Sequence, residues 1–143
     1  MELTLKENVD ISSDLGELLD IHSMESGQKI STENQKEYFS FALYDGEELI
    51  GGLTARFSLG RFYIQLLAVS KIYRKQGIGK RLMQIAQKKA REMNCHHILL
   101  TTYSYQGTHF YPKIGFEELA KIPDFPVQGV DKLYFIKYLK ENN

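Results

Sequence analysis

Alternating and short apolar stretches along the chain predict a protein rich in β-strands. We expect strands at residues 2–8, 38–44, 48–57, 62–69, 97–103, 116–122 and 133–138. Asp45-Gly46 separates two of these stretches and predicts a tight hairpin, because glycine supplies the positive φ that such a turn requires. A second turn at residues 58–61 leads into the next strand. Three antiparallel strands are therefore expected before residue 70.

Helical spacing of apolar residues predicts two longer helices and one short helix. Ser12-Ser13-Asp14 offers caps for a first helix, which carries Leu15, Leu18, Leu19 and His22 on one face and ends near Ser26-Gly27. A second helix begins near Gly79, with a stripe of Leu82, Ala86, Ala90 and Met93, Ile85 beside it and Asn94 as a left-handed C-cap. The short helix is expected at residues 108–114 and closes at Gly115. Because the second helix joins strands 62–69 and 97–103, these strands should run parallel.

Length and composition indicate one soluble domain, residues 1–143. A chain of 143 residues can bury most of its apolar surface without disulfides. Its single cysteine, Cys95, excludes an internal disulfide and agrees with a reducing cytoplasm. The polar N-terminus is unlike a secretory signal, and no apolar run is long enough to span a membrane. We therefore expect a cytoplasmic protein that does not bind membranes.

The charges cancel overall but are unevenly distributed. The 18 basic and 18 acidic side chains give a formal net charge of zero, which argues against a nucleic-acid partner. Residues 1–50 hold twelve acids and three lysines, whereas residues 71–92 hold eight basic residues and one glutamate. Such runs are typical of solvated helix faces. They also fit a protein that holds an anionic ligand in its middle and a cationic one near its first third.

A glycine-containing loop before the second helix is the most informative motif of the chain. It consists of Arg74-Lys75-Gln76-Gly77-Ile78-Gly79, and Lys80 and Arg81 follow it. Two glycines at the start of a helix let backbone N–H groups approach a ligand, and the helix dipole adds positive potential. The pattern indicates a site for phosphate oxygens, most naturally a pyrophosphate. It lacks the spacing of a Walker loop, and Leu82 stands where a dinucleotide fingerprint needs a small residue.

This loop resembles the signature of the GNAT superfamily of N-acetyltransferases, Arg/Gln-x-x-Gly-x-Gly/Ala. Two other stretches resemble the same family, Ile50-Gly51-Gly52-Leu53 and the short helix with Phe110-Tyr111-Pro112-Lys113-Ile114-Gly115-Phe116. The matches occur in the family's order and cover nearly the whole chain. The resemblance implies an α/β fold with a mixed, mostly antiparallel central sheet flanked by helices, in which the fourth and fifth strands are parallel and splayed.

The resemblance also implies acetyl-coenzyme A as the acetyl donor, bound between strands 62–69 and 97–103. Backbone groups of Leu67, Ala68 and Val69 are expected to hold its pantetheine arm. Its pyrophosphate is expected at the loop, on Arg74, Lys75, Gln76, Gly77, Ile78, Gly79 and Lys80. Relatives often use an asparagine after the fifth strand to touch the cofactor. Here Ser104 stands at that place, with Gln106 close by.

The implied activity is transfer of the acetyl group to a primary amine of a small molecule or a protein. Tyr111 resembles the family's general acid, which protonates the departing thiolate, and a backbone N–H of strand 62–69 is expected to serve the oxyanion. Many relatives carry a glutamate base on the fourth strand, but this chain has Gln65 there, which takes no proton at neutral pH. A water chain, a carboxylate such as Glu37, or delivery of free amine would replace that base. His109 is more typical of an exposed or packed histidine than of a base.

Other functions fit the sequence less well. A non-catalytic acyl-coenzyme A binding module is the alternative, and release of free thiol in the presence of amines distinguishes the two. Cys95-His96-His97 is not expected to bind a metal, because neighbours on a strand point to opposite faces and no second ligand cluster exists. The acceptor is expected among the first helix, residues 27–36 and the loop 123–129. Its identity, the range of acyl groups and a homodimer stay open.

Overall fold

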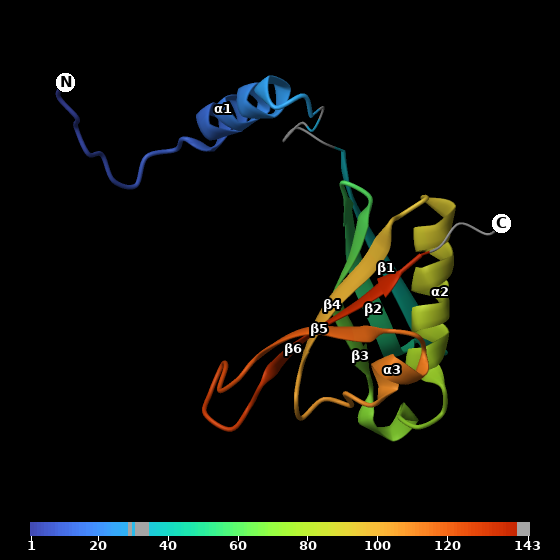
Figure 1. Cartoon of the computed structure of the whole chain (residues 1–143). Helices are drawn as coiled ribbons and strands as arrows, with labels where there is room; N and C mark the ends of the chain where they lie inside the picture. The colour runs from blue at the N-terminus through green and yellow to red at the C-terminus, as the bar shows by residue number, and fades with distance from the viewer. Residues whose placement is uncertain (29, 31–34, 140–143) are drawn as a thin grey trace. The chain divides into compact units, whose positions relative to one another are not determined.

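The computed structural model describes residues 1–28, 30 and 35–139 (Figure 1). The chain divides into two compact units, Met1–Gln35 and Lys36–Asn143. The first unit contains helix α1 (Ser12–Glu25). The second contains β1 (Lys36–Asp45), β2 (Glu48–Ser58), β3 (Arg61–Val69), the 3₁₀ turn η1 (Lys71–Tyr73), α2 (Ile78–Glu92), β4 (His97–Tyr103), α3 (Phe110–Lys113), β5 (Glu117–Ile122) and β6 (Lys132–Tyr138). No helix among the described residues is long and apolar enough to cross a membrane.

Residues 2–8 form no strand, so this sequence prediction is wrong. The side chains of Leu3 and Leu5 are 83% and 84% exposed. An alternating pattern shows only that a segment is suited to the strand conformation, because a strand also needs a neighbouring strand that pairs with its backbone groups. The strands expected as fourth and fifth are therefore the third and fourth of the observed sheet, β3 and β4.

Helix α1 ends as predicted, and Gly27 follows it with a φ of +82°. Its start differs from the prediction. Ile11 is the N-cap residue and no side chain caps the helix, so the expected caps from Ser12-Ser13-Asp14 are wrong. The helix begins at Ser12, directly after Ile11, so these three residues lie in its first turn, where the Asp14 carboxylate interacts favourably with the helix dipole. No residue of α1 is buried.

The second unit is built on a six-stranded sheet in the order β1-β2-β3-β4-β6-β5. Only β3 and β4 pair in parallel, and every other neighbouring pair is antiparallel. Gly46 has a φ of +62° in the β1–β2 turn, where Asp45 pairs with Glu48. These observations confirm the mixed, mostly antiparallel sheet, the first hairpin and the parallel pair.

Helix α2 covers one face of this sheet and forms the core with it (Figure 1). The side chains that α2 buries are Leu82, Met83, Ala86 and Ala90. The predicted stripe is thus confirmed at three positions, while Met93 is half-buried and Met83 was missed. A Cβ at Gly51 of β2 would lie 3.0 Å from Cγ2 of Ile78 and 3.2 Å from the Ala68 carbonyl oxygen. Glycine there allows the first turn of α2 to pack closely against the sheet, beside the end of β3.

Candidate active site

The parallel pairing of β3 with β4 stops halfway along β3. Ladder pairs join residues 61–64 to residues 97–100, and the last of them is Ile64 with Leu100. β3 stays paired with β2 as far as Val69, and β4 stays paired with β6 as far as Tyr103. The second halves of β3 and β4 therefore present edges to each other that no described ladder pair joins. This is the splay that the resemblance implies.

A β-bulge lies at the point where β3 and β4 separate. In the β2–β3 pairing, Ala55 is opposite Ile64 and Thr54 is opposite Leu66, so Gln65 is an extra residue on β3. A bulge bends its strand and increases the local twist. Because the β3–β4 pairing ends at Ile64, we attribute the opening to this extra residue.

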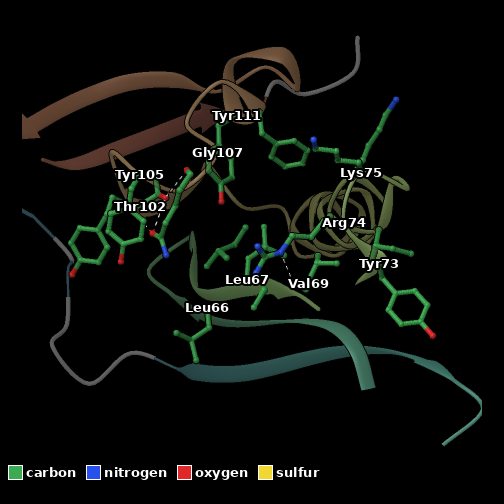
Figure 2. A pocket seen from close by; sticks show the side chains of 18 of the residues that line it. Leu66, Leu67, Val69, Tyr73, Arg74, Lys75, Thr102, Tyr105, Gly107 and Tyr111 are labelled. Atoms are coloured by element: carbon green, nitrogen blue, oxygen red, sulfur yellow. Dashed lines mark hydrogen bonds between the residues drawn. The ribbon is translucent and has the colours of Figure 1, made fainter. Parts of the chain in front are cut away.

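The opening forms a cleft of about 1030 Å³ (Figure 2). Its lining comes from the end of β3, the loop before α2, the start of α2, the end of β4 with the turn after it, and α3. These residues are Ile64, Gln65, Leu66, Leu67, Ala68, Val69, Tyr73, Arg74, Lys75, Gly77, Ile78, Gly79, Lys80, Thr101, Thr102, Tyr103, Tyr105, Gln106, Gly107, Phe110 and Tyr111. Of the predicted site residues, the structure brings all but Gln76 and Ser104 to this cleft. Their roles stay predictions.

Local hydrogen bonds hold the loop between β3 and α2. Nε of Arg74 donates to the Val69 carbonyl oxygen at 3.1 Å, which folds the loop back onto the end of β3. Nε2 of Gln76 donates to the Ile72 carbonyl oxygen at 3.2 Å, so its side chain supports the loop rather than lining the cleft. Lys75 has a φ of +64°, which is uncommon for a residue with a side chain. The loop thus adopts a left-handed bend directly before the helix.

The two glycines of the loop serve different purposes. Gly77, the N-cap residue of α2, has a φ of +80°, a conformation that favours glycine. Gly79 is helical, and a Cβ there would meet only Cζ of Phe110 at 3.8 Å and Cγ2 of Val69 at 3.9 Å. These are ordinary contacts, so neither backbone conformation nor packing requires glycine at position 79. Close approach of a ligand to the backbone gives a reason for it.

The start of α2 is suited to an anion. The first intrahelical bond runs from the Arg81 N–H to the Gly77 carbonyl oxygen at 2.9 Å, and no side chain caps the helix. The N–H groups of residues 78–80 precede that bond and have no acceptor within the helix. Arg74, Lys75 and Lys80 line the same end of the cleft. Backbone donors, helix dipole and side-chain charge together fit the pyrophosphate of acetyl-coenzyme A.

Tyr111 lies in the cleft on α3, within an aromatic cluster. Its ring centroid is 5.3 Å from that of Phe110, 6.0 Å from that of Phe116 and 5.4 Å from that of Phe135. Burial raises the pKa of the Tyr111 hydroxyl above its usual 10.0. The hydroxyl is therefore protonated at neutral pH and can donate a hydrogen bond into the cleft.

Lys137 on β6 fixes the end of the short helix that carries Tyr111. Its Nζ donates to the Ile114 carbonyl oxygen at 2.9 Å and to Oε1 of Gln87 on α2 at 2.6 Å. Burial and the nearby Arg91 lower the pKa of Lys137. A Cβ at Gly115 would lie 3.0 Å from this Nζ, and Gly115 also has a φ of +97°. A four-residue helix is thereby tied to both the sheet and α2.

After β4, Gln106 and not Ser104 reaches the cleft. Oε1 of Gln106 accepts hydrogen bonds from Oγ1 of Thr102 at 3.2 Å and from the Tyr103 N–H at 3.0 Å. The Ser104 hydroxyl accepts a bond from the Asp131 N–H at 2.9 Å, which ties the turn to the loop before β6. Gln106 carries an amide close to the place where relatives often have an asparagine, and this was a sequence signal for a role in the cleft. The direction of its side chain, however, depends on how the turn folds.

The cleft contains no residue in its described lining that takes up a proton at neutral pH, because none is Asp, Glu or His. Glu37 pairs with Phe57 near the start of β1, at the end of the sheet where β3 begins, and is absent from the lining. His109 is exposed and lies outside the cleft. In the described part of the chain, no cluster of three His, Cys, Asp or Glu could hold a metal ion. The expected acceptor region includes residues 29 and 31–34, which lie outside the described residues.

Comparisons with known proteins agree with this geometry. The acetyltransferase (GNAT) family matches residues 9–116. Blasticidin-S acetyltransferase of Streptomyces morookaense is 32% identical over 71% of this chain and 75% of its own. N-alpha-acetyltransferase 30 of Dictyostelium discoideum is 27% identical over 76% of this chain and 62% of its own. An acetyltransferase from Bacillus cereus ATCC 14579 has a crystal structure with a TM-score of 0.77 and 26% identity, covering 96% of this chain and 98% of that one.

The family match covers the loop, the splayed strands and the helix with Tyr111. The structural likeness extends the match over the rest of the sheet. The chain therefore belongs to the GNAT acetyltransferase family and is an N-acetyltransferase that takes its acetyl group from acetyl-coenzyme A.

Proposed function

We propose that the protein acetylates a primary amine of a small molecule or of a protein in the cleft between β3 and β4. The interruption of the β3–β4 ladder after Ile64 carries the proposal, since one opening then reaches both an anion-binding helix start and the hydroxyl of Tyr111. Relatives support both kinds of acceptor. One is named for blasticidin S and another for transfer to an α-amino group.

The donor would be held mainly by backbone groups. The edge of β3 at Leu67, Ala68 and Val69 offers amide and carbonyl groups to the pantetheine arm, because β4 no longer pairs with it. The N–H groups at the start of α2 and the charges of Arg74, Lys75 and Lys80 would hold the pyrophosphate. Ser104 is left outside this set by its bond to Asp131.

In the reaction, the amine nitrogen bonds to the acetyl carbon, the carbon–sulfur bond breaks, and the sulfur departs as a thiolate. The nitrogen loses one proton to solvent water as the amide forms. Tyr111 would donate to that sulfur, because its hydroxyl stays protonated at neutral pH. An ordinary thiol has a pKa of about 8.5, below that of the raised Tyr111 hydroxyl, so complete proton transfer runs uphill. A hydrogen bond to the developing thiolate would thus supply much of the effect.

The amine would enter the reaction uncharged. A protonated amine has no lone pair for attack, and the described lining offers no Asp, Glu or His to deprotonate it. Gln65, at the bulge, can orient an amine through its side-chain amide but cannot take its proton. The unprotonated fraction of the acceptor in solution would therefore supply the reacting species.

We further propose that this activity resides in the cytoplasm. The state of the single cysteine supports this: Cys95 is free and 5% exposed, as suits a reducing compartment.

A screen of primary amines that monitors release of free thiol from acetyl-coenzyme A tests the proposed function. The panel should hold small amines, peptides with free N-termini, and a sample without amine as background. Acetyl transfer predicts thiol release that depends on the amine, with an equal amount of acetylated product by mass spectrometry. Binding of coenzyme A without thiol release for any amine would instead support the non-catalytic binding module.

A further inference from the structure

The two ends of the cleft differ in chemistry. Figure 2 shows Lys75 and Tyr105 at opposite sides of the pocket, with Tyr111 between them. All cationic side chains of the described lining, Arg74, Lys75 and Lys80, belong to the loop and the start of α2. The other end is lined by the turn after β4 and by the bulged part of β3. This end, which we call the tyrosine end, contains Gln65, Leu66, Thr101, Tyr103, Tyr105 and Gln106.

Tyr103 and Tyr105 stack at the tyrosine end. Their ring centroids are 5.9 Å apart and the ring planes differ by 8°, an offset-parallel arrangement. Tyr105 is 71% exposed although it lines the cleft. An exposed aromatic ring beside a pocket offers a flat, apolar face that water covers poorly.

The backbone beneath the two rings is well held. Tyr103 forms the last ladder pair of β4, with Lys132 of β6. The Tyr103 N–H donates to Oε1 of Gln106, and the Gln106 N–H donates to the Tyr103 carbonyl oxygen at 2.9 Å. Thr102, which precedes Tyr103 on β4, is 7% exposed and also donates to Oε1 of Gln106. The ring faces are thus presented by an ordered turn, which reduces the entropy lost on binding.

The charges around the tyrosine end disfavour a cationic group there. Nζ of Lys132 lies 5.6 Å from the ring centroids of both Phe125 and Tyr134, so a cation already occupies the neighbouring aromatic surface. No carboxylate belongs to the described lining of the cleft. A second cation would be repelled by the Lys132 ammonium group. An uncharged planar group is free of that cost.

We propose that the tyrosine end is the acceptor subsite, and that it takes primary amines bearing an uncharged planar ring, aromatic or heteroaromatic. The ring stacks on Tyr105, and the amine then points toward the part of the cleft beside Tyr111. This inference rests on the proposed function and specifies its substrate class. A protein amine without such a ring is a poorer substrate.

A matched pair of amines tests this specificity. Benzylamine and cyclohexylmethylamine carry a planar and a saturated six-membered ring at the same distance from nitrogen. Values of kcat/KM should be calculated per concentration of unprotonated amine, because the two amines ionise differently. We expect benzylamine to be preferred by about 3- to 10-fold, the range for an aromatic pair beyond simple burial.

Variants of Tyr105 test whether its ring causes the preference for benzylamine. Tyr105→Leu keeps an apolar side chain and should reduce the ratio of the two kcat/KM values to about one, whereas Tyr105→Phe should retain it. Tyr38→Leu is the matched control, since Tyr38 is 68% exposed on β1 and lies outside the cleft lining. It should leave the ratio unchanged.

Three results would overturn the inference while leaving acetyl transfer intact. These are equal kcat/KM values for the two amines, a preference that survives Tyr105→Leu, or a Tyr105→Leu variant that raises only the KM for acetyl-coenzyme A. The last result would assign the ring to the donor. Absence of thiol release with every amine of the wider screen would instead overturn the proposed function, and this inference with it.

Discussion

The Tyr73 hydroxyl donates a 2.8 Å hydrogen bond to Oδ2 of Asp45, and this bond joins the loop before α2 to the β1–β2 turn. The two residues are 28 positions apart in the chain. The bond raises the pKa of Tyr73 to about 12, with burial and the Asp45 charge adding to the effect. Since Tyr73 lines the cleft, the β1–β2 turn helps to position the end of the cleft where we propose that the pyrophosphate binds.

Replacing Asp45 should release this loop. In Asp45→Asn, the Tyr73 pKa should fall from about 12 toward 10, because the carboxylate no longer favours the neutral phenol. Because the raised pKa belongs to the folded state, the bond stabilises the fold below pH 10 and its contribution is lost as the pH rises toward 12. Absorbance titration at alkaline pH measures the shift. The same titration of Tyr73→Phe assigns it among the nine tyrosines.

The KM for acetyl-coenzyme A should rise in both Asp45→Asn and Tyr73→Phe, and the double variant should be no worse than the single ones. Additive effects of the two substitutions would show that the residues act separately.

A negative charge at Gly79 should abolish donor binding. Coenzyme A at about one hundred times its Kd stabilises a protein by about 2.7 kcal/mol, which corresponds to a Tm increase of roughly 5–10 °C. Gly79→Glu should remove this increase, because it adds bulk and negative charge at the proposed phosphate site. Thermal unfolding with and without coenzyme A measures the effect.

Gly79→Ala is the control for that substitution. An added Cβ would meet its neighbours at 3.8 and 3.9 Å, so the Tm without ligand should not fall. A normal coenzyme A response in Gly79→Glu would contradict the assignment of the phosphate site.

Loss of the Tyr111 hydroxyl should slow turnover without loosening the fold. Tyr111→Phe keeps the ring and its contacts with Phe110, Phe116 and Phe135. We expect kcat to fall by about 10²-fold, the lower end for a positioned general acid, because a thiolate leaves moderately well unprotonated. Steady-state kinetics should show little change in the KM of either substrate. A kcat close to that of the wild type would remove Tyr111 from the mechanism.

The pH profile should follow the acceptor. If no side chain takes the amine proton, kcat/KM should rise about tenfold per pH unit up to the pKa of the amine itself. Amines of different pKa should therefore shift the midpoint of the profile. Because the Tyr111 pKa is raised above 10.0, any loss from its ionisation lies above pH 10. A midpoint near pH 6–7 that is the same for all amines would reveal a base on the protein.

Most of the fold was predictable because its signals are local. The Asp45-Gly46 turn, the glycine loop and the apolar stripe of α2 are each contained in one continuous stretch of the sequence. Residues 2–8 show the limit of such signals, since their alternation expresses a preference that only a partner strand can satisfy. The caps of α1 show a second limit, because Ile11 precedes the polar residues that seemed suited to that role.

The parts of the site that sequence reasoning missed depend on distant contacts. Tyr73 reaches Asp45 across 28 positions, and Lys137 reaches Ile114 across 23. The extra residue at Gln65 left no clear local signal, because the buried face moves from Ile64 to Leu67 while the apolar Leu66 and Ala68 would also continue a period of two. The direction of the Gln106 side chain depends on how its turn folds back onto β4.

The bulge at Gln65 also divides β3 into two segments of different local stability. Residues 61–64 are held by ladders to both β2 and β4, whereas residues 66–69 are held by β2 alone. Opening one ladder costs less free energy than opening two, so local opening becomes easier along the strand. Backbone amide hydrogens should then exchange with solvent slowly in the first half of β3 and faster in the second. The interruption that opens the cleft therefore also leaves part of the sheet prone to local opening. A bound acetyl donor would make this opening less frequent.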